Sequence, residues 1–236
     1  MNENKTNSLL IVNQLNKVVT SPDGDLVLLN DVNFSINSAE SVAIIGASGA
    51  GKSTLLAILA GLDVPTSGQI LLDDTDFFSV DEDARAKIRG RLIGFVFQSF
   101  QLLPSLTALE NVMLPLELLA IKQAESKAKH VLNRVGLASR ANHYPRQLSG
   151  GEQQRVAIAR AFAVEPKILL ADEPTGNLDM KTGEKIIDLL FSLNSEQGTT
   201  LILVTHDEKL ASRCERKLQM DSGVLCELKD RENDRN

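Results

Sequence analysis

Residues 42–60 read VAIIGASGAGKSTLLAILA. The first four residues are apolar and predict a buried β-strand, whereas the run from Ser53 to Ala60 predicts a helix. The segment between them matches the pattern G-x-x-x-x-G-K-[ST], and a strand before it with a helix after it is the context that a phosphate-binding P-loop requires. A chance glycine-rich turn is the alternative, and the flanking strand and helix argue against it.

Each residue of this loop is a candidate contact of a nucleoside triphosphate. Glycine permits backbone turns that aim N–H groups at phosphate oxygens, and the start of the following helix adds the positive end of its dipole. Lys52 should reach the β- and γ-phosphates, and the Ser53 hydroxyl should ligate Mg²⁺. The predicted nucleotide-binding residues of the loop are Gly46, Ala47, Ser48, Gly49, Ala50, Gly51, Lys52, Ser53 and Thr54.

Two carboxylates end another apolar run, which extends from Ile168 to Ala171. Such a position suits an acid that organises magnesium and a base that activates water. Asp172 is therefore predicted to hold the metal and Glu173 to polarise the attacking water. A strand that simply ends in solvated acids is the alternative, and the P-loop elsewhere in the chain disfavours it.

Apolar strands alternate with helices over much of the chain, which indicates an α/β fold. Buried strands typical of a parallel sheet are expected at residues 42–45, 168–171 and 200–205. Before them, residues 9–19 and 26–36 flank a turn at residues 21–24 and predict an antiparallel β flank. The predicted fold is a RecA-like P-loop NTPase core with this N-terminal flank and an inserted α-helical lobe.

Helix signals dominate the predicted lobe, residues 99–163, which lies within one domain of residues 1–236. The capping pattern S/T-x-x-E predicts helix starts at Ser79, Thr107 and Ser149. Gly136 should end a helix that runs from about residue 123 to 135. A strand is expected at residues 92–97, and the polar residues 229–236 are expected to form a disordered tail.

Composition excludes several classes of protein. The apolar runs fall far short of the ~20 residues that a membrane helix needs, and the N-terminus lacks the features of a signal peptide. A net charge of −6 argues against nonspecific binding of nucleic acid. Cys214 and Cys226 are expected to be free thiols in a reducing compartment. The chain is thus expected in the cytoplasm, with any membrane role exerted through a partner.

Residues 148–153 read LSGGEQ and precede a predicted helix, residues 153–162. Ser149 and the glycine N–H groups would form a second anion cradle at a helix N-terminus. An ordinary helix N-cap is the alternative: it would explain Ser149 and Glu152, but it would not explain the paired glycines. Together with the P-loop and the paired acids, in this order, the segment resembles the signature of the ABC ATPase family, and the resemblance covers nearly the whole chain.

The resemblance implies a head-to-tail dimer that sandwiches two ATP molecules, in which Ser149, Gly150 and Gly151 of one subunit close over the γ-phosphate held by the other. It also implies a Q-loop glutamine at Gln98 that touches Mg²⁺ and the attacking water. By the same resemblance, Asp179 belongs to the D-loop at the dimer interface, and His206 is the switch histidine that contacts the γ-phosphate. The implied catalytic residues are therefore Glu173, His206 and Gln98, the metal ligands are Ser53, Gln98 and Asp172, and the cofactors are ATP and Mg²⁺.

Two departures from the family pattern matter. Glu152 stands where the signature has glutamine, which leaves the serine and the glycines intact. The aromatic residue that stacks on adenine is absent, because residues 16–19 read NKVV and the only tyrosine is Tyr144. Stacking on the base is therefore not expected.

Within the family, residues 97–115 and 171–179 look like those of the bacterial lipoprotein-release and macrolide-export group. That resemblance implies a permease with a large periplasmic domain, a lipid-like, lipoprotein or other hydrophobic substrate, and a place at the cytoplasmic face of the inner membrane. Phe100, Leu102 and Leu103 are either permease contacts or lobe core. A soluble ABC ATPase that acts on ribosomes or DNA is the alternative, but such proteins carry two cassettes or a coiled-coil insertion, which this chain lacks.

Overall fold

The computed structural model describes residues 8–22 and 24–228. The chain divides into two compact units: residues 1–79 with 202–236 form the first, and residues 80–201 form the second. The expected C-terminal tail, residues 229–236, lies outside the described residues. Within the described part, no helix is long and apolar enough to cross a membrane.

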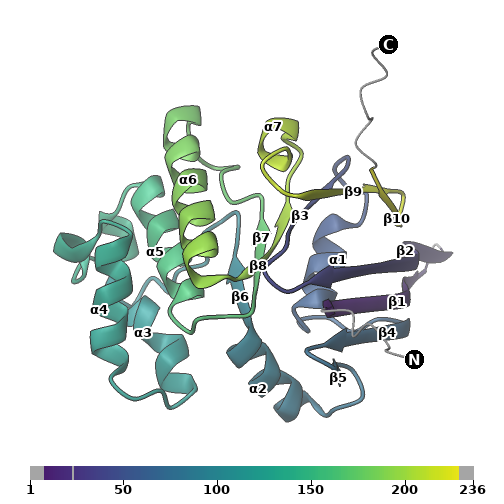
Figure 1. The fold of residues 1–236 in the computed structure, drawn as a ribbon, viewed down its shortest axis with the longest axis horizontal. Helices are drawn as coiled ribbons and strands as arrows, with labels where there is room; N and C mark the ends of the chain where they lie inside the picture. The colour runs from purple at the N-terminus through teal and green to yellow at the C-terminus, as the bar shows by residue number, and fades with distance from the viewer. Residues whose placement is uncertain (1–7, 23, 229–236) are drawn as a thin grey trace, which may run out of the picture. The chain divides into compact units, whose positions relative to one another are not determined.

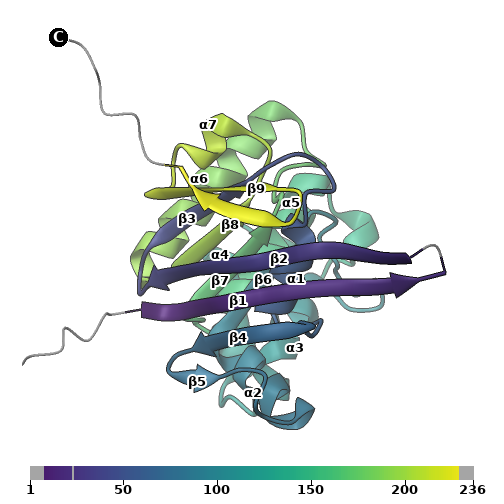
Figure 2. The same ribbon diagram turned by 90° about the vertical axis from the view of Figure 1, so that its right-hand side faces the viewer.

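An antiparallel sheet with the strand order β2-β1-β4-β5 lies in the first unit (Figure 2). Val12 pairs with Phe34 across β1 and β2, and Leu10 pairs with Leu72 across β1 and β4. The predicted β flank is thereby confirmed, with the predicted turn between its two long strands. The strands are β1 (Ser8–Ser21), β2 (Gly24–Asn37), β4 (Ser67–Leu72) and β5 (Thr75–Asp76).

Parallel strands complete the first unit. β3 (Ser41–Ile45) pairs in parallel with β9 (Arg216–Asp221), which pairs antiparallel with β10 (Val224–Glu227). Val42, Ala43 and Ile44 are fully buried, as a strand covered on both faces requires. The helices of this unit are α1 (Lys52–Leu59) and α7 (Glu208–Ala211), and β8 (Thr200–Val204) crosses the division between the units.

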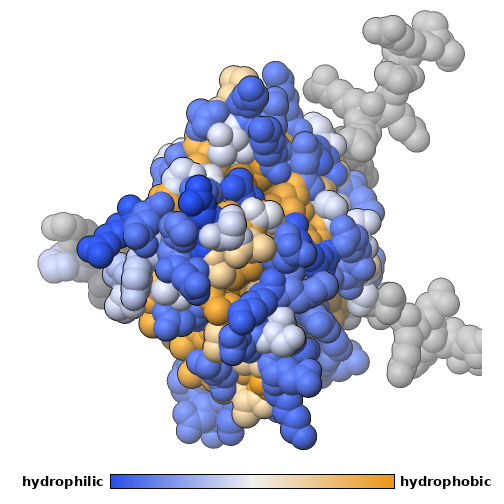
Figure 3. All heavy atoms as spheres, turned by 90° about the vertical axis from the view of Figure 1, so that its left-hand side faces the viewer, coloured by the Kyte–Doolittle hydropathy of each residue, from blue (hydrophilic) through white to orange (hydrophobic). Residues whose placement is uncertain are grey.

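Most of the second unit is helical (Figure 1), and it extends beyond the predicted lobe of residues 99–163 at both ends. Its two strands, β6 (Ile93–Val96) and β7 (Ile168–Asp172), pair in parallel. On the face of Figure 3 charged and polar side chains predominate, with apolar side chains between them. The helices are α2 (Glu82–Leu92), α3 (Ala108–Leu118), α4 (Ala124–Arg134), α5 (Gly150–Phe162) and α6 (Met180–Gln197), with short 3-10 turns η1 (Ala138–Arg140) and η2 (Pro145–Gln147).

Helix caps agree with the sequence at two of the three predicted starts. Thr107 and Ser149 each form a full capping box, at the starts of α3 and α5. The prediction of Ser79 as a cap is wrong: Asp81 caps α2 by accepting a hydrogen bond from the Ala84 N–H, whereas the Ser79 hydroxyl donates to the Asp76 carbonyl. Aspartate is as good an N-cap as serine, and here it stands next to the helix.

Element boundaries differ from the prediction in two places. α5 begins at Gly150 rather than near residue 153, so the signature glycines belong to its first turn. β6 is shorter than the predicted strand at residues 92–97, because Leu92 still belongs to α2. The predicted helix end is confirmed, since α4 ends at Arg134 and Gly136 adopts a left-handed φ of +73°.

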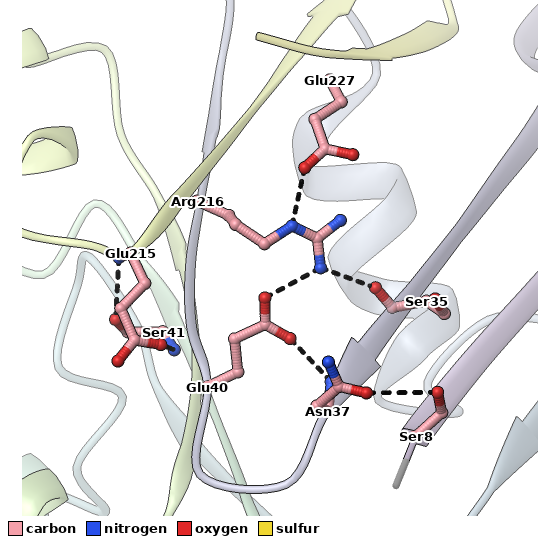
Figure 4. A network of polar contacts seen from close by, with 8 residues as sticks. All are labelled: Ser8, Ser35, Asn37, Glu40, Ser41, Glu215, Arg216 and Glu227. Carbon is pink, nitrogen blue, oxygen red and sulfur yellow. Dashed lines mark hydrogen bonds and ion pairs between the residues drawn. The ribbon is translucent and has the colours of Figure 1, made fainter. Parts of the chain in front are cut away.

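A cluster of polar side chains around Arg216 connects several strands of the first unit (Figure 4). The Arg216 guanidinium donates to Glu227 at 2.7 Å, to Glu40 at 2.8 Å and to the Ser35 carbonyl at 3.0 Å. The hydrogen bond with Glu227 is the main cause that raises the pKa of Arg216, and the hydrogen bond and charge of Glu40 add to it. The cluster ties β9 and β10 to the turn that leads into β3.

Both cysteines are free, as expected. Cys226 is exposed, whereas Cys214 is buried, and burial raises the pKa of its thiol to about 12. A thiol with so high a pKa is protonated at neutral pH and is a poor nucleophile. The structure therefore assigns no chemical role to Cys214.

Candidate functional site

The P-loop lies in the first unit, between β3 and α1. Gly46, Gly49 and Gly51 have φ of +156°, +80° and +106°. A Cβ at Gly46 would lie 2.2 Å from the Met220 carbonyl oxygen, so only glycine fits there. No side chain caps α1, and the N-terminus of a helix favours an anion.

Lys52 extends along this loop. Its Nζ donates to the carbonyl oxygens of Gly46 at 2.7 Å and Ala47 at 2.8 Å, and the residue is buried. Ser53 is exposed and Thr54 is half-buried in the first turn of α1. The cation and the hydroxyl predicted to meet phosphate and metal thus lie together on one loop.

His206 follows the strand that lies next to β3. The Thr205 N–H donates to the Ile44 carbonyl at 3.2 Å, so His206 comes just after a point of contact with the strand that leads into the P-loop. The histidine is exposed, and the next residue, Asp207, caps α7. Of the predicted site residues, the first unit therefore brings together the P-loop and the segment of His206.

The second unit holds the predicted acids and Gln98. Val96 is in register with Ala171, so Gln98 and Asp172 follow the same end of two parallel strands. The Asn177 side chain donates to the Gln98 carbonyl at 2.9 Å. A Cβ at Gly176 would lie 2.7 Å from Gln98 Nε2. Gln98 is thus in close contact with the turn that follows Glu173.

Glu173 has an unusual backbone. Its φ of +42° lies in the left-handed region, which non-glycine residues enter rarely, often at functional sites. The Gly176 N–H donates to the Glu173 carbonyl at 3.0 Å and closes a turn with Pro174 in its second position. Both Asp172 and Glu173 are half-buried.

The signature segment begins α5. The Ser149 hydroxyl accepts from the Glu152 N–H, and the Glu152 carboxylate accepts from the Ser149 N–H and hydroxyl, both at 2.8 Å. The hydrogen bond from the Ser149 backbone, then that from its hydroxyl, lowers the pKa of Glu152. Ser149 is exposed, so the cap still presents this segment to a ligand or a partner.

The glycines of this segment, Gly150 and Gly151, also lie close to the turn before α6 and to α6 itself. A Cβ at Gly151 would lie 2.6 Å from Thr182 Cγ2, and one at Gly150 would lie 3.3 Å from Leu178 Cδ2. Asp179 caps α6 by accepting from the Thr182 N–H at 3.0 Å. Close packing therefore accounts for part of the need for glycine at these two positions.

Sequence reasoning missed two polar residues of α5, the half-buried Arg160 and the buried Gln154. Arg160 donates to the Phe100 carbonyl at 3.0 Å and the Gln101 carbonyl at 2.6 Å, and burial lowers its pKa. Gln154 is fully buried and donates to the Pro174 carbonyl at 2.6 Å. The only signal in the sequence was the presence of a polar residue among apolar positions of the helix. Such a residue does not indicate which group its side chain binds.

The donors suit a magnesium ion that is shared with phosphate. Among the described residues, no group of three or more His, Cys, Asp or Glu side chains could hold a metal ion by itself. Mg²⁺ bound with nucleotide needs only one or two protein oxygens besides phosphate and water. The Ser53 hydroxyl and the Asp172 carboxylate are oxygen ligands of this kind.

A groove of about 730 Å³ lies in the second unit beside α2 and α3. Its apolar lining consists of Phe95, Phe97, Pro115, Leu118 and Leu119, together with smaller side chains, and its charged lining includes Asp83, Lys87 and Arg89. Leu118 is 78% exposed and adjoins the other apolar side chains of the groove, so the groove presents a contiguous apolar surface. Phe100, Leu102 and Leu103, named from the sequence as permease contacts or core, do not line this groove.

The α/β fold and the phosphate-binding loop define a P-loop nucleotide-binding protein. Residues 29–176 match the family model described as ABC transporter. The chain is 54% identical over 222 residues to YbbA of Escherichia coli K12, described as an uncharacterized ABC transporter ATP-binding protein, with 93% of this chain and 97% of YbbA covered. This chain belongs to the ABC transporter family, as one of its ATP-binding subunits.

Two further similarities support this assignment. The lipoprotein-releasing system ATP-binding protein LolD of Legionella pneumophila (strain Paris) is 51% identical over 200 residues, which cover 84% of this chain and 88% of LolD. The ATP-binding cassette MJ0796, solved as a dimer in a post-hydrolysis state with ADP and Pi, superposes with a TM-score of 0.86 at 44% identity and covers 94% of this chain and 99% of its own. The expected resemblance to the lipoprotein-release group is confirmed, and the chain is an ATPase of the ABC class.

Gly176→Ala tests the contact with Gln98. The new methyl group would meet the Gln98 amide and displace it. Because small displacements of a group that positions the reactants lower the rate strongly, ATP hydrolysis should fall by roughly tenfold or more. The melting temperature should hardly change, because Gly176 is exposed and the displaced atom ends a flexible side chain.

Gly183→Ala is the matched control, because its Cβ would meet Thr175 only at an ordinary 3.4 Å. Steady-state ATPase rates and thermal melts of both variants make the comparison. Normal turnover of Gly176→Ala would show that the position of the Gln98 amide is unimportant.

Proposed function

We propose that this chain hydrolyses ATP to power a separate membrane permease, working as a homodimer at the cytoplasmic face of the inner membrane. The observation that carries the proposal is the apolar groove beside α2 and α3, with its exposed Leu118, in a chain whose family couples ATP to transport. A nucleotide-binding protein that acted alone would have no need of such a surface.

The roles of the phosphate-binding residues follow from their chemistry. The N–H groups of residues 46–54 and the Lys52 ammonium hold the β- and γ-phosphates. Ser53 and Asp172, with Gln98, hold Mg²⁺, which when bound neutralises charge that develops on the phosphate oxygens.

Hydrolysis requires a positioned water. Glu173 accepts a proton from the water as it attacks the γ-phosphate, since a half-buried carboxylate at a strand end is a suitable general base. Gln98 orients that water, and His206 donates a hydrogen bond to the γ-phosphate. Each side chain acts on the same reacting group, so loss of any one lowers turnover.

The homodimer supplies the remaining contacts. Ser149, Gly150 and Gly151 of one subunit cover the γ-phosphate bound by the other, and Asp179 lies at the interface between them. Two facts support this arrangement: Ser149 is exposed at the start of α5, and the similar cassette MJ0796 was solved as a dimer.

A cytoplasmic helix of the permease occupies the groove. An amphipathic helix with apolar anchors suits a lining of phenylalanine, proline and leucine side chains, and an acidic residue on it would pair with Lys87 or Arg89. This assignment moves the docking surface from Phe100, Leu102 and Leu103 to Pro115, Leu118 and Leu119.

The substrate is lipid-like, a lipoprotein or another hydrophobic compound, and the permease carries a large periplasmic domain. Similarity to LolD, a lipoprotein-releasing system protein, supports this class of substrate. The competing function, a soluble ABC ATPase that acts on ribosomes or DNA, has no comparable support in a chain of net charge −6.

Glu173→Gln tests the catalytic assignment. The variant should bind ATP normally but hydrolyse it roughly 10²–10⁴-fold more slowly, because the water loses its base while the phosphate contacts remain. The trapped ATP should then hold the dimer together. Light scattering with and without Mg-ATP measures the dimer, and near-normal turnover or a strictly monomeric variant would refute the role.

Leu118→Asp tests the groove. A charge on its apolar lining should release the protein from membranes of cells that contain the permease, whereas the ATPase activity of the isolated subunit should persist. Leu103→Asp is the control, because Leu103 is also exposed, at 43%, but lies outside the groove. Membrane release by Leu103→Asp alone would return the docking site to the segment first predicted.

The preference of the protein for ATP over GTP tests whether the absence of an adenine-stacking aromatic residue matters. Val19 is 42% exposed and offers no ring to the base, a loss of ~1–3 kcal/mol in other base-binding sites. GTP should therefore compete well with ATP, and Val19→Tyr should favour ATP. Steady-state hydrolysis of both nucleotides decides the matter: a native preference for ATP above about a hundredfold, or about 2.7 kcal/mol, would mean that other contacts recognise adenine.

A further inference from the structure

Gln154 is an amide in a place where an apolar side chain would be expected. It is fully buried on α5, whereas its chain neighbours Gln153 and Arg155 are half-buried, and its Oε1 has no hydrogen-bond partner in the structure. A buried acceptor without a partner destabilises a fold, and an apolar residue of similar size would avoid that penalty. The Gln154 amide instead donates a hydrogen bond from Nε2 to the Pro174 carbonyl, at 2.6 Å.

The Pro174 carbonyl belongs to a turn whose backbone conformation is intrinsically unfavourable. Glu173 adopts a left-handed φ of +42°, and a residue before proline is further restricted by the proline ring. Such a conformation persists only where the surroundings fix it. The Gly176 N–H holds one side of the turn through the Glu173 carbonyl, and Gln154 holds the other side through the buried Pro174.

The same helix begins at the signature segment. Ser149 caps α5, and Gln154 lies on α5 a little more than one turn further along. The structure therefore joins two regions that the proposed function assigns to different ATP molecules of the dimer: the cradle over the partner's nucleotide, and the base that acts on the chain's own nucleotide.

Resting on that proposed function, we infer that Gln154 is a positioning residue: its hydrogen bond to Pro174 sets the direction of the Glu173 carboxylate and links this carboxylate to the signature helix. Gln154 itself touches neither nucleotide nor water. Its loss leaves ATP binding intact and slows the chemical step, because the carboxylate remains present but misdirected.

Gln154→Met removes the donor and keeps the volume, with Gln154→Leu as a second variant should methionine lower the yield of folded protein. The turnover number should fall at least tenfold, while the KM for ATP changes by less than about twofold. Thr199→Val is the matched control, since the buried Thr199 hydroxyl donates to the carbonyl of Pro166, near the opposite end of β7. This control should lose stability but keep its turnover number.

A purely structural role of Gln154 would give a different result in the Glu173→Gln background. A positioning residue for Glu173 has nothing left to position there, so Gln154→Met/Glu173→Gln should form the ATP-bound dimer as readily as Glu173→Gln alone. A weakened dimer would show that Gln154 supports the signature segment in general, and it would overturn the inference. An unchanged turnover number of Gln154→Met and of Gln154→Leu would overturn it as well.

The proposed function fails in a distinguishable way. If Glu173→Gln alone hydrolyses ATP normally, the assignment of the base is wrong, whatever Gln154 does. If Glu173→Gln is inactive and dimeric while Gln154→Met behaves as Thr199→Val does, the base stands and the positioning role is refuted.

Discussion

The backbone of the turn between β3 and α1 is the constraint on which the rest of the site depends. Its glycines adopt positive φ values, and at Gly46 and Gly51 a side chain would collide with the carbonyls of Met220 and Leu28. The turn is held from outside as well, because the Gly223 N–H donates to the Ala50 carbonyl at 3.0 Å. The start of α1 is thereby held in a conformation that suits phosphate, on which the proposed chemistry acts.

Chemical roles are divided between the two units. The first unit carries Lys52 and Ser53, which are proposed to hold phosphate and Mg²⁺, and the segment of His206, which contacts the strand before the P-loop. The second carries the acids, Gln98 and the signature segment, in mutual contact through the turn after Glu173 and the start of α6. Such a division suits an enzyme whose chemistry must respond to a partner, because the proposed base and the proposed dimer contacts belong to one compact unit.

Local rules predicted most of the fold. Apolar runs identified the buried strands, capping boxes identified the starts of α3 and α5, and a glycine identified the end of α4. These features depend on neighbours within a few residues. The prediction at Ser79 was wrong because two capping residues stood near each other, and pattern alone does not decide which side chain meets the helix.

The chemical motifs were also visible in the sequence, since their spacing is itself the signal. What the sequence did not reveal was how those motifs are held. Gln154 and Arg160 bond to carbonyls 20 and about 60 positions away along the chain. Any residue can supply a backbone carbonyl, so no residue type marks the partner, and only the tertiary structure identifies it.

The helix α5 unites these hidden contacts. At 13 residues it is about 20 Å long. Its start presents Ser149, its middle holds the turn after Glu173 through Gln154, and near its end Arg160 binds the carbonyls of Phe100 and Gln101 and lines the apolar groove. A packed helix moves as a rigid element, so under the proposed function a displacement at the groove would reach the signature segment and Glu173 together. Within the proposed function, α5 is thus the physical route by which a permease could sense ATP.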